Sequence, residues 1–75
     1  MPSQIAKEIH LFLLQNRYDT PYWTTGALAA HFDMTVYQMR HHLLALLKEQ
    51  WIFRSIPRSG LPVVWWCRLI VPEKS

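Results

Sequence analysis

Four polar side chains near the middle of the chain could contact nucleic acid: Tyr37, Gln38, Arg40 and His41. Glutamine can form two hydrogen bonds with adenine, arginine can do the same with guanine, and a tyrosine hydroxyl can donate to a phosphate. The same residues could instead form the solvated face of an ordinary helix. For the group as a whole, we favour contact with double-stranded DNA.

Arg54, Arg58 and Ser59 form a second group of candidate DNA contacts. Arginines on a hairpin can reach a backbone phosphate or the minor groove, or can simply protect the edge of the hairpin from further pairing. We favour contact for Arg58, whereas both interpretations stay open for Arg54. The complete predicted set of DNA-binding residues is Thr35, Val36, Tyr37, Gln38, Arg40, His41, Arg54, Arg58 and Ser59.

The net charge of the chain is +3 and is unevenly distributed. Residues 1–34 hold two basic and three acidic residues, whereas residues 35–75 hold six basic and two acidic residues. A basic segment suits a polyanion, because phosphate contacts by Lys and Arg release counterions. The excess is modest, and by itself it does not decide between nucleic acid and other partners.

Metal binding and catalysis have little support in the sequence. His41 and His42 are adjacent, so on a helix they point about 100° apart and cannot chelate a metal as a pair. His10 and His31 fall on other predicted helices. No Ser-His-Asp or Cys-His arrangement and no glycine-rich phosphate loop is evident. We therefore expect no metal, no cofactor, no small-molecule substrate and no enzymatic activity.

The third of three predicted helices, from Val36 to about Gln50, would present the first candidate group. Thr35 can cap this helix, and Gln38 three residues later completes a capping box, in which each side chain accepts a hydrogen bond from the other residue's backbone N–H. Residues three and four apart share a helix face. The face expected to pack on the core carries Met39, Leu43, Leu46 and Gln50. The opposite face carries Tyr37, His41, Leu44 and Lys48.

Two earlier helices would support the third. The first runs from a Ser3 cap to about Asn16, and the second runs from about Gly26 to Phe32 with Thr25, or alternatively Thr24, as its cap. The turn-forming segment 17–22 separates them, and residues 22–24 predict a short strand before the second helix. The first helix is expected to bury Ile5, Ile9, Phe12 and Leu13.

Two runs rich in β-branched and aromatic residues, 51–56 and 63–69, predict a hairpin. The loop between them, 57–62, holds Gly60 and two prolines. Along the second run, Trp65 and Cys67 alternate with Trp66 and Arg68, so one set can cover the helices. The order helix, short strand, helix, helix, hairpin is that of a winged helix-turn-helix, an α+β fold that is mostly α.

We expect a single domain over residues 1–75, with residues 70–75 as a frayed tail. A chain of 75 residues with 51% hydrophobic content has room for one core. Its single cysteine, Cys67, cannot form an internal disulfide, which fits the reducing cytoplasm. Lys7, Glu8 and His10 interrupt the first apolar stretch, so we expect neither a signal peptide nor a membrane span.

The motif Thr-x-Tyr-Gln-x-Arg at 35–40 is followed by Arg54-Ser55, Arg58 and a Gly60-to-Trp65 hairpin. From about Thr35 to Trp66 the chain resembles the small fimbrial-operon regulators of enterobacteria, of the PapI, FaeA and PefI type. The resemblance implies a transcriptional regulator of fimbrial or pilus genes, involved in phase variation. It also implies a partner, a leucine-responsive global regulator. The sequence departs from the family pattern at His41-His42, Tyr22-Trp23 and Trp51.

Three apolar residues, Leu44, Leu47 and Trp66, lie away from the predicted inner faces. They can form a docking patch, since contiguous exposed apolar surface marks interfaces. For Leu44 and Leu47, however, we favour packing against the hairpin or the first helix, and the same question arises for Trp66. The alternative function is therefore a winged-helix protein-interaction module that does not read DNA. No dimerisation helix is visible in the sequence, so we expect a monomer in the absence of a partner or DNA.

Overall fold

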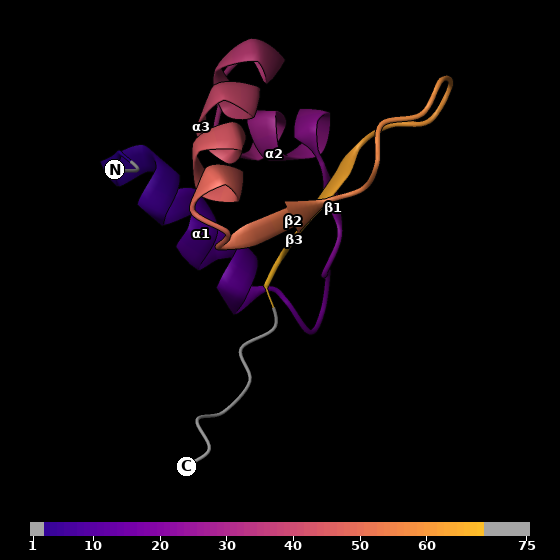
Figure 1. The fold of residues 1–75 in the computed structure, drawn as a ribbon. Helices are drawn as coiled ribbons and strands as arrows, with labels where there is room; N and C mark the ends of the chain where they lie inside the picture. Colours follow the sequence, from indigo (N-terminus) through magenta and orange to yellow (C-terminus); the bar gives the residue numbers. More distant parts are fainter. Residues whose placement is uncertain (1–2, 69–75) are drawn as a thin grey trace.

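The structure is a computed structural model that describes residues 3–68. These residues form three helices and three strands: α1 (Gln4–Gln15), β1 (Trp23–Thr24), α2 (Thr25–His31), α3 (Val36–Lys48), β2 (Ile52–Arg54) and β3 (Val64–Cys67). The strands form one antiparallel sheet in the order β1-β3-β2. The helices pack together, and the hairpin of β2 and β3 extends away from them as the wing (Figure 1). The predicted α+β winged helix is confirmed; the predicted tail at 70–75 lies outside the described residues.

Each helix begins at a hydroxyl cap. The Ser3 side chain accepts a hydrogen bond from the backbone N–H three residues further on in α1, and Thr24 does the same in α2, both at 3.1 Å. Of the two threonines that could cap α2, Thr24 has this role, which leaves the Thr25 side chain available for other contacts. None of the described helices is long and apolar enough to cross a membrane.

The end of α3 differs from the prediction. The helix ends at Lys48, and Gln50 has a φ of 64°, in the left-handed region. The N–H of Trp51 donates to the carbonyl of Leu46, and the N–H of Gln50 donates to that of Leu47. This is a Schellman motif, which satisfies the last carbonyls of a helix and turns the chain away from it. Gln50 is therefore exposed, and the prediction that it lies on the buried face is wrong.

The core lies between the three helices and the inner face of the sheet. In α1 the buried stripe is Ala6, Ile9 and Leu13, whereas Phe12 is only half-buried. Ile5 was expected in the core but is 41% exposed, because the stripe that starts at Ala6 places Ile5 at its edge. The fully or nearly fully buried residues are Ala6, Ile9, Leu13, Leu28, Ala29, Met39, Leu43, Leu46, Ile52, Trp65 and Cys67.

The register of the sheet decides which side chains face the helices. Arg54 pairs with Trp65 on the inner face, and Phe53 pairs with Trp66 on the outer face. Trp65 and Cys67 are buried, as the alternation predicted, and Trp66 is half-buried on the opposite side of β3. The inner face of the wing thus carries an arginine next to a buried tryptophan.

Candidate nucleic-acid interface

One side of α3 is buried in the core and the other is open to solvent. Met39, Leu43 and Leu46 are fully buried, and their contacts fix the rotation of the helix about its axis. The five predicted contact residues of α3 are all exposed: Val36, Tyr37, Gln38, Arg40 and His41. Tyr37 is 83% exposed, so almost its whole ring is accessible to a ligand. The helix therefore presents an aromatic, amide and cationic surface along its first half.

The capping box at the start of α3 limits what Gln38 can do. The Gln38 N–H donates to the Thr35 hydroxyl, and the Gln38 side-chain oxygen accepts from the Thr35 N–H, both at 3.0 Å. A two-bond contact with adenine uses both the oxygen and the nitrogen of the amide. Since the cap already engages the oxygen, the amide NH₂ is the part of Gln38 that is free to donate to DNA.

A hollow lies between α3 and the inner face of the wing. Arg40 reaches it from α3 and Arg54 reaches it from β2. The Arg54 guanidinium carbon is 5.8 Å from the centre of the Trp65 ring, close enough for a cation–π contact. The residues that line the hollow are Thr25, Arg40, Leu44, Arg54, Pro57, Val63 and Trp65. No Asp or Glu is among these described lining residues, so two cations share the hollow without an acidic neighbour.

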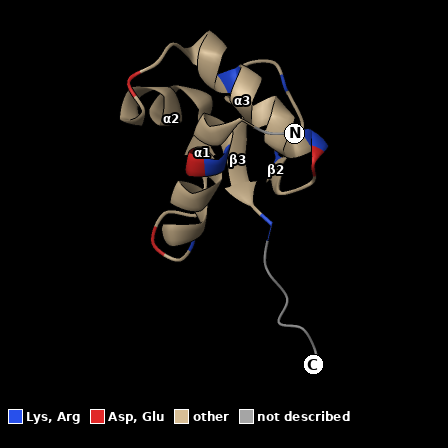
Figure 2. Ribbon diagram, turned by 90° about the vertical axis from the view of Figure 1, so that its left-hand side faces the viewer, with Lys and Arg blue, Asp and Glu red and all other residues tan. Residues whose placement is uncertain are grey.

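The charged residues of the described chain are also unevenly distributed over its surface. Figure 2 shows basic residues on α3 and on the wing, and also one on α1, where an acidic residue lies beside it. The acidic residues of the described part of the chain lie on α1, in the loops after α1 and α2, and just after α3: Glu8, Asp19, Asp33 and Glu49. The side of the molecule formed by α3 and the wing is therefore the one best suited to a polyanion.

The structure separates the two predicted wing arginines. Arg54 faces the hollow, whereas Arg58 and Ser59 are exposed at the tip of the hairpin loop. At the tip the Leu61 N–H donates to the Arg58 carbonyl at 3.2 Å, and Gly60 has a φ of 80°. A type II turn requires a positive φ at this position, which glycine adopts without strain.

Exposed apolar side chains near the wing tip are a feature that sequence reasoning missed. Ile56 is 81% exposed and lies with Leu61 around a shallow hollow next to Arg58. The two flanking prolines indicated a loop, but no sequence pattern indicated that this loop would leave its apolar residues open to solvent.

The predicted partner patch does not form one surface. Leu44 is 40% exposed in the hollow beside the wing, and Leu47 is half-buried and packs against the core. Trp66 lies on the outer face of the sheet, where its ring centre is 5.5 Å from that of Tyr22 and 6.4 Å from that of Phe53. The structure thus replaces the predicted patch with an aromatic group on the outer sheet face.

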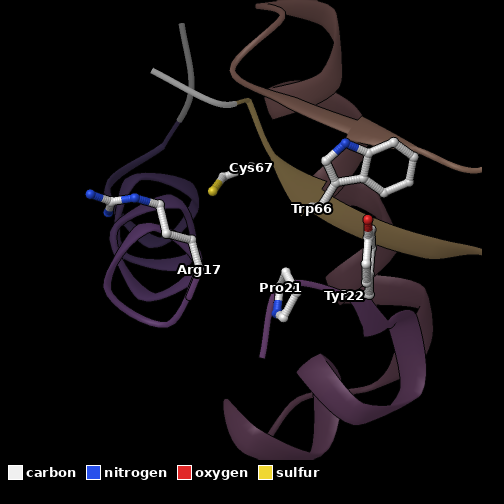
Figure 3. A pocket seen from close by; sticks show the side chains of 5 residues that line it. All are labelled: Arg17, Pro21, Tyr22, Trp66 and Cys67. Atoms are coloured by element: carbon white, nitrogen blue, oxygen red, sulfur yellow. The ribbon is translucent and has the colours of Figure 1, made fainter. Parts of the chain in front are cut away.

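A small pocket adjoins this aromatic group where the end of β3 meets the end of α1 and the loop that follows it. It is lined by Arg17, Pro21, Tyr22, Trp66 and Cys67 (Figure 3). The Cys67 thiol points to the backbone carbonyl of Leu13, with the sulfur 3.8 Å from the oxygen. Burial raises the pKa of this thiol, and the positive charge of Arg17 partly opposes the rise. Cys67 is thus a packing residue at the end of α1.

The histidines make separate packing contacts. His10 lies on Trp51, with ring centres 5.0 Å apart, and His31 stacks on Phe12 at 4.2 Å. Burial lowers the pKa of His10. Within residues 3–68, no group of three or more His, Cys, Asp or Glu residues is placed to hold a metal ion.

The family model for FaeA-like proteins matches residues 6–68. The chain belongs to this family. The match runs from the first turn of α1 to just past the end of β3, so it includes every element that forms the core and the hollow. Membership confirms the predicted resemblance and indicates a protein of the fimbrial-regulator type. A comparison with curated proteins gave no match.

Four residues that line the hollow in this FaeA-like chain were not predicted as site residues, and of these only Thr25 and Trp65 carry a polar side-chain group. Thr25 was considered only as a possible helix cap, and Trp65 only as a core residue. In the structure the Trp65 indole N–H donates to the Thr25 hydroxyl at 2.8 Å. Thr25 and Trp65 are 40 residues apart in the chain, so no local pattern could have indicated this contact.

Proposed function

We propose that this protein is a transcriptional regulator that binds promoter DNA through α3 and the wing and controls fimbrial or pilus genes. The observation that carries the proposal is the shared hollow, where Arg40 of α3 and Arg54 of the wing lie together with no acidic residue among the lining residues. Both arginines line the same hollow, so a DNA phosphate bound there could form charge-assisted hydrogen bonds with either or both of them.

In the proposed complex, the first half of α3 enters the major groove. The groove is about 12 Å wide and admits one helix. Arg40 is placed to contact guanine or a phosphate, the Gln38 amide NH₂ donates to a base acceptor, and the Tyr37 hydroxyl donates to a phosphate. Thr35 and Val36 lie at the helix start, closest to the backbone, and His41 lies one turn after Tyr37. Arg58 and Ser59 at the wing tip contact the flanking backbone.

The proposal includes a protein partner. A single small reader has a limited contact area, so a helper protein would add selectivity. The family resemblance suggests a leucine-responsive global regulator for this role, at sites sensitive to adenine methylation. The protein would act in the cytoplasm as a binding protein, without catalysis and without a cofactor.

The test compares charge removal at the interface with charge removal elsewhere. A cognate site is first selected from random duplex DNA, and affinity is then measured by fluorescence anisotropy over a range of salt concentrations. Arg40→Ala should weaken binding to the cognate site by about 1–3 kcal/mol, as for the loss of a charge-assisted contact with a guanine or a phosphate. Arg58→Ala should weaken binding to all sequences alike and reduce the salt slope by about 1.

Lys7→Ala is the matched control, because it also removes one exposed positive charge but on α1. It should change the affinity much less than either arginine variant. If Arg40→Ala and Arg58→Ala both fold and both bind DNA as tightly as the wild type, the proposed function is wrong.

A second candidate function is a protein-interaction module that does not read DNA. It is favoured by the outer sheet face, where Tyr22, Phe53 and Trp66 form a solvent-accessible aromatic group. The salt titration separates the two candidates. An affinity for random duplex DNA that does not fall steeply with salt would favour the interaction module. Both functions can hold, because the two surfaces lie on different faces of the sheet.

A further inference from the structure

Trp65 holds two polar groups in place at the hollow between α3 and the wing. Its indole N–H donates to the Thr25 hydroxyl at 2.8 Å, and the Arg54 guanidinium carbon lies 5.8 Å from its ring centre. Trp65 is only 1% exposed, so its own position is set by the core. A rigid side chain that contacts both groups restricts their orientations and reduces the entropy that they would lose on binding a ligand.

The contact with Trp65 also sets the direction of the Thr25 hydroxyl. A threonine hydroxyl has one hydrogen to donate and two lone pairs to accept with. One lone pair accepts the indole N–H, and no acceptor for the hydroxyl hydrogen is present among the described residues. The helix cap is provided by Thr24, so capping does not occupy Thr25. Because the oxygen accepts the indole N–H, its own hydrogen is free to donate to a ligand in the hollow that Thr25 lines.

We propose that this hollow binds one phosphodiester group of duplex DNA. The Thr25 hydroxyl donates to one phosphate oxygen and the guanidinium groups of Arg40 and Arg54 donate to the others, while Trp65 is a positioning residue for Thr25 and Arg54. A phosphate suits this set of groups, because it offers several acceptor oxygens and a negative charge to a site with two cations and a directed hydroxyl. The inference rests on the proposed DNA binding and adds Thr25 and Trp65 to the interface.

The first experiment replaces the hydroxyl by a methyl group of similar size. Affinity for a fluorescent duplex of random sequence is measured by anisotropy, because a phosphate contact does not depend on sequence. Thr25→Val should weaken binding about tenfold, as for one hydrogen bond to a charged group. The control Thr25→Ser keeps the hydroxyl and should bind like the wild type. The salt slope should stay unchanged in Thr25→Val, because the hydroxyl carries no charge, whereas Arg54→Ala should reduce it by about 1.

Thr25→Val leaves the Trp65 N–H without an acceptor, and this can destabilise the fold. A second comparison avoids the problem. Trp65→Phe alone and Trp65→Phe combined with Thr25→Val both lack the indole donor, so neither leaves it unpaired. The double variant should bind the random duplex more weakly than Trp65→Phe. The affinity lost on adding Thr25→Val to Trp65→Phe should be smaller than the affinity lost on adding Thr25→Val to the wild type, because phenylalanine no longer orients the hydroxyl. If Trp65 were merely structural, the two losses would be equal.

The outcomes separate this inference from the proposed function. If folded Thr25→Val binds the duplex as tightly as the wild type while Arg54→Ala binds more weakly, Thr25 does not contact a phosphate and the inference is overturned, but the proposed function stands. Equal binding by Trp65→Phe and the double variant overturns the inference in the same way. If the wild type itself shows no salt-dependent binding to duplex DNA, the proposed function fails and the inference fails with it.

Discussion

Replacing Gln38 by Glu should make the protein more stable and a weaker DNA binder at the same time. Gln38 is the third residue of α3, and its side-chain oxygen accepts the Thr35 N–H at 3.0 Å. Glutamate has nearly the same shape, and its carboxylate can accept the same hydrogen bond. The change removes the amide NH₂ and adds a negative charge at the start of a helix whose first turn holds no acidic residue.

The expected magnitudes follow from the position of this charge. A carboxylate near a helix N-terminus contributes about 0.3–1 kcal/mol through the helix dipole. For a domain of this size, 1 kcal/mol corresponds to about 4–8 °C in Tm, so the melting temperature should rise by a few degrees. In the complex the carboxylate would lie next to DNA phosphates and would lack the NH₂ donor. We therefore expect a loss of affinity of about 1–3 kcal/mol for the selected site.

The two effects are measured on the same variant by thermal unfolding and by anisotropy with the selected duplex. Thr35→Ala is the comparison that removes the cap, and it should lower the free energy of unfolding by about 1 kcal/mol, whereas Thr35→Ser should retain most of the stability. A Gln38→Glu variant less stable than the wild type would contradict the capping geometry. A variant that binds DNA as tightly as the wild type would show that the start of α3 does not approach DNA.

Three further predictions concern the fold. Leu43→Ala removes a fully buried side chain from the centre of α3. In a denaturant titration it should lower the free energy of unfolding by about 2–5 kcal/mol. A loss below about 1 kcal/mol would contradict the described core. Gly60→Ala places a Cβ at a φ of 80° and should cost about 1–2 kcal/mol, measured by thermal unfolding, whereas Ser59→Ala should cost little. Burial lowers the pKa of His10 from its ordinary value of 6.5. The His10 side chain therefore binds a proton more readily in the unfolded chain than in the folded chain. As the pH drops below about 6.5, the contribution of His10 to the free energy of unfolding falls. Unfolding between pH 7 and 5 should therefore depend less on pH in His10→Phe than in the wild type, and equal pH dependence would show that His10 is not the cause.

Features that depend on neighbours in the chain were predictable. The capping box of Thr35 and Gln38 joins residues three apart, and the buried face of α3 at Met39, Leu43 and Leu46 follows from the helical period. The order of elements was sufficient to predict the winged helix, because a short hairpin after three helices has few ways to cover their core. The motif at 35–40 with the following hairpin was sufficient to indicate the family.

Predictions failed where the outcome depended on packing between distant segments or on the backbone conformation of a single residue. Ile5 belongs to an apolar stripe by spacing, but the packing of α1 against α3 and β3 buries the stripe that begins at Ala6 instead. Gln50 fits the periodicity of α3, but the helix ends at Lys48 because Gln50 itself adopts a left-handed conformation. Leu44 and Trp66 looked alike in the sequence as apolar residues off the inner faces, yet the structure places them on different faces of the sheet.

The sequence by itself thus determined the three helices, the caps of α1 and α3, the wing and the side of α3 that is open to solvent. Each of these depends on hydrogen bonds and periodicity within a few residues. Only the tertiary structure decided that Arg54 joins Arg40 in one hollow while Arg58 lies apart at the wing tip. The reason is the register of β2 against β3, which pairs Arg54 with Trp65 and turns both toward the helices. The same pairing lets a buried tryptophan from the wing orient a threonine of α2, a contact that exists only after the hairpin has docked on the helices.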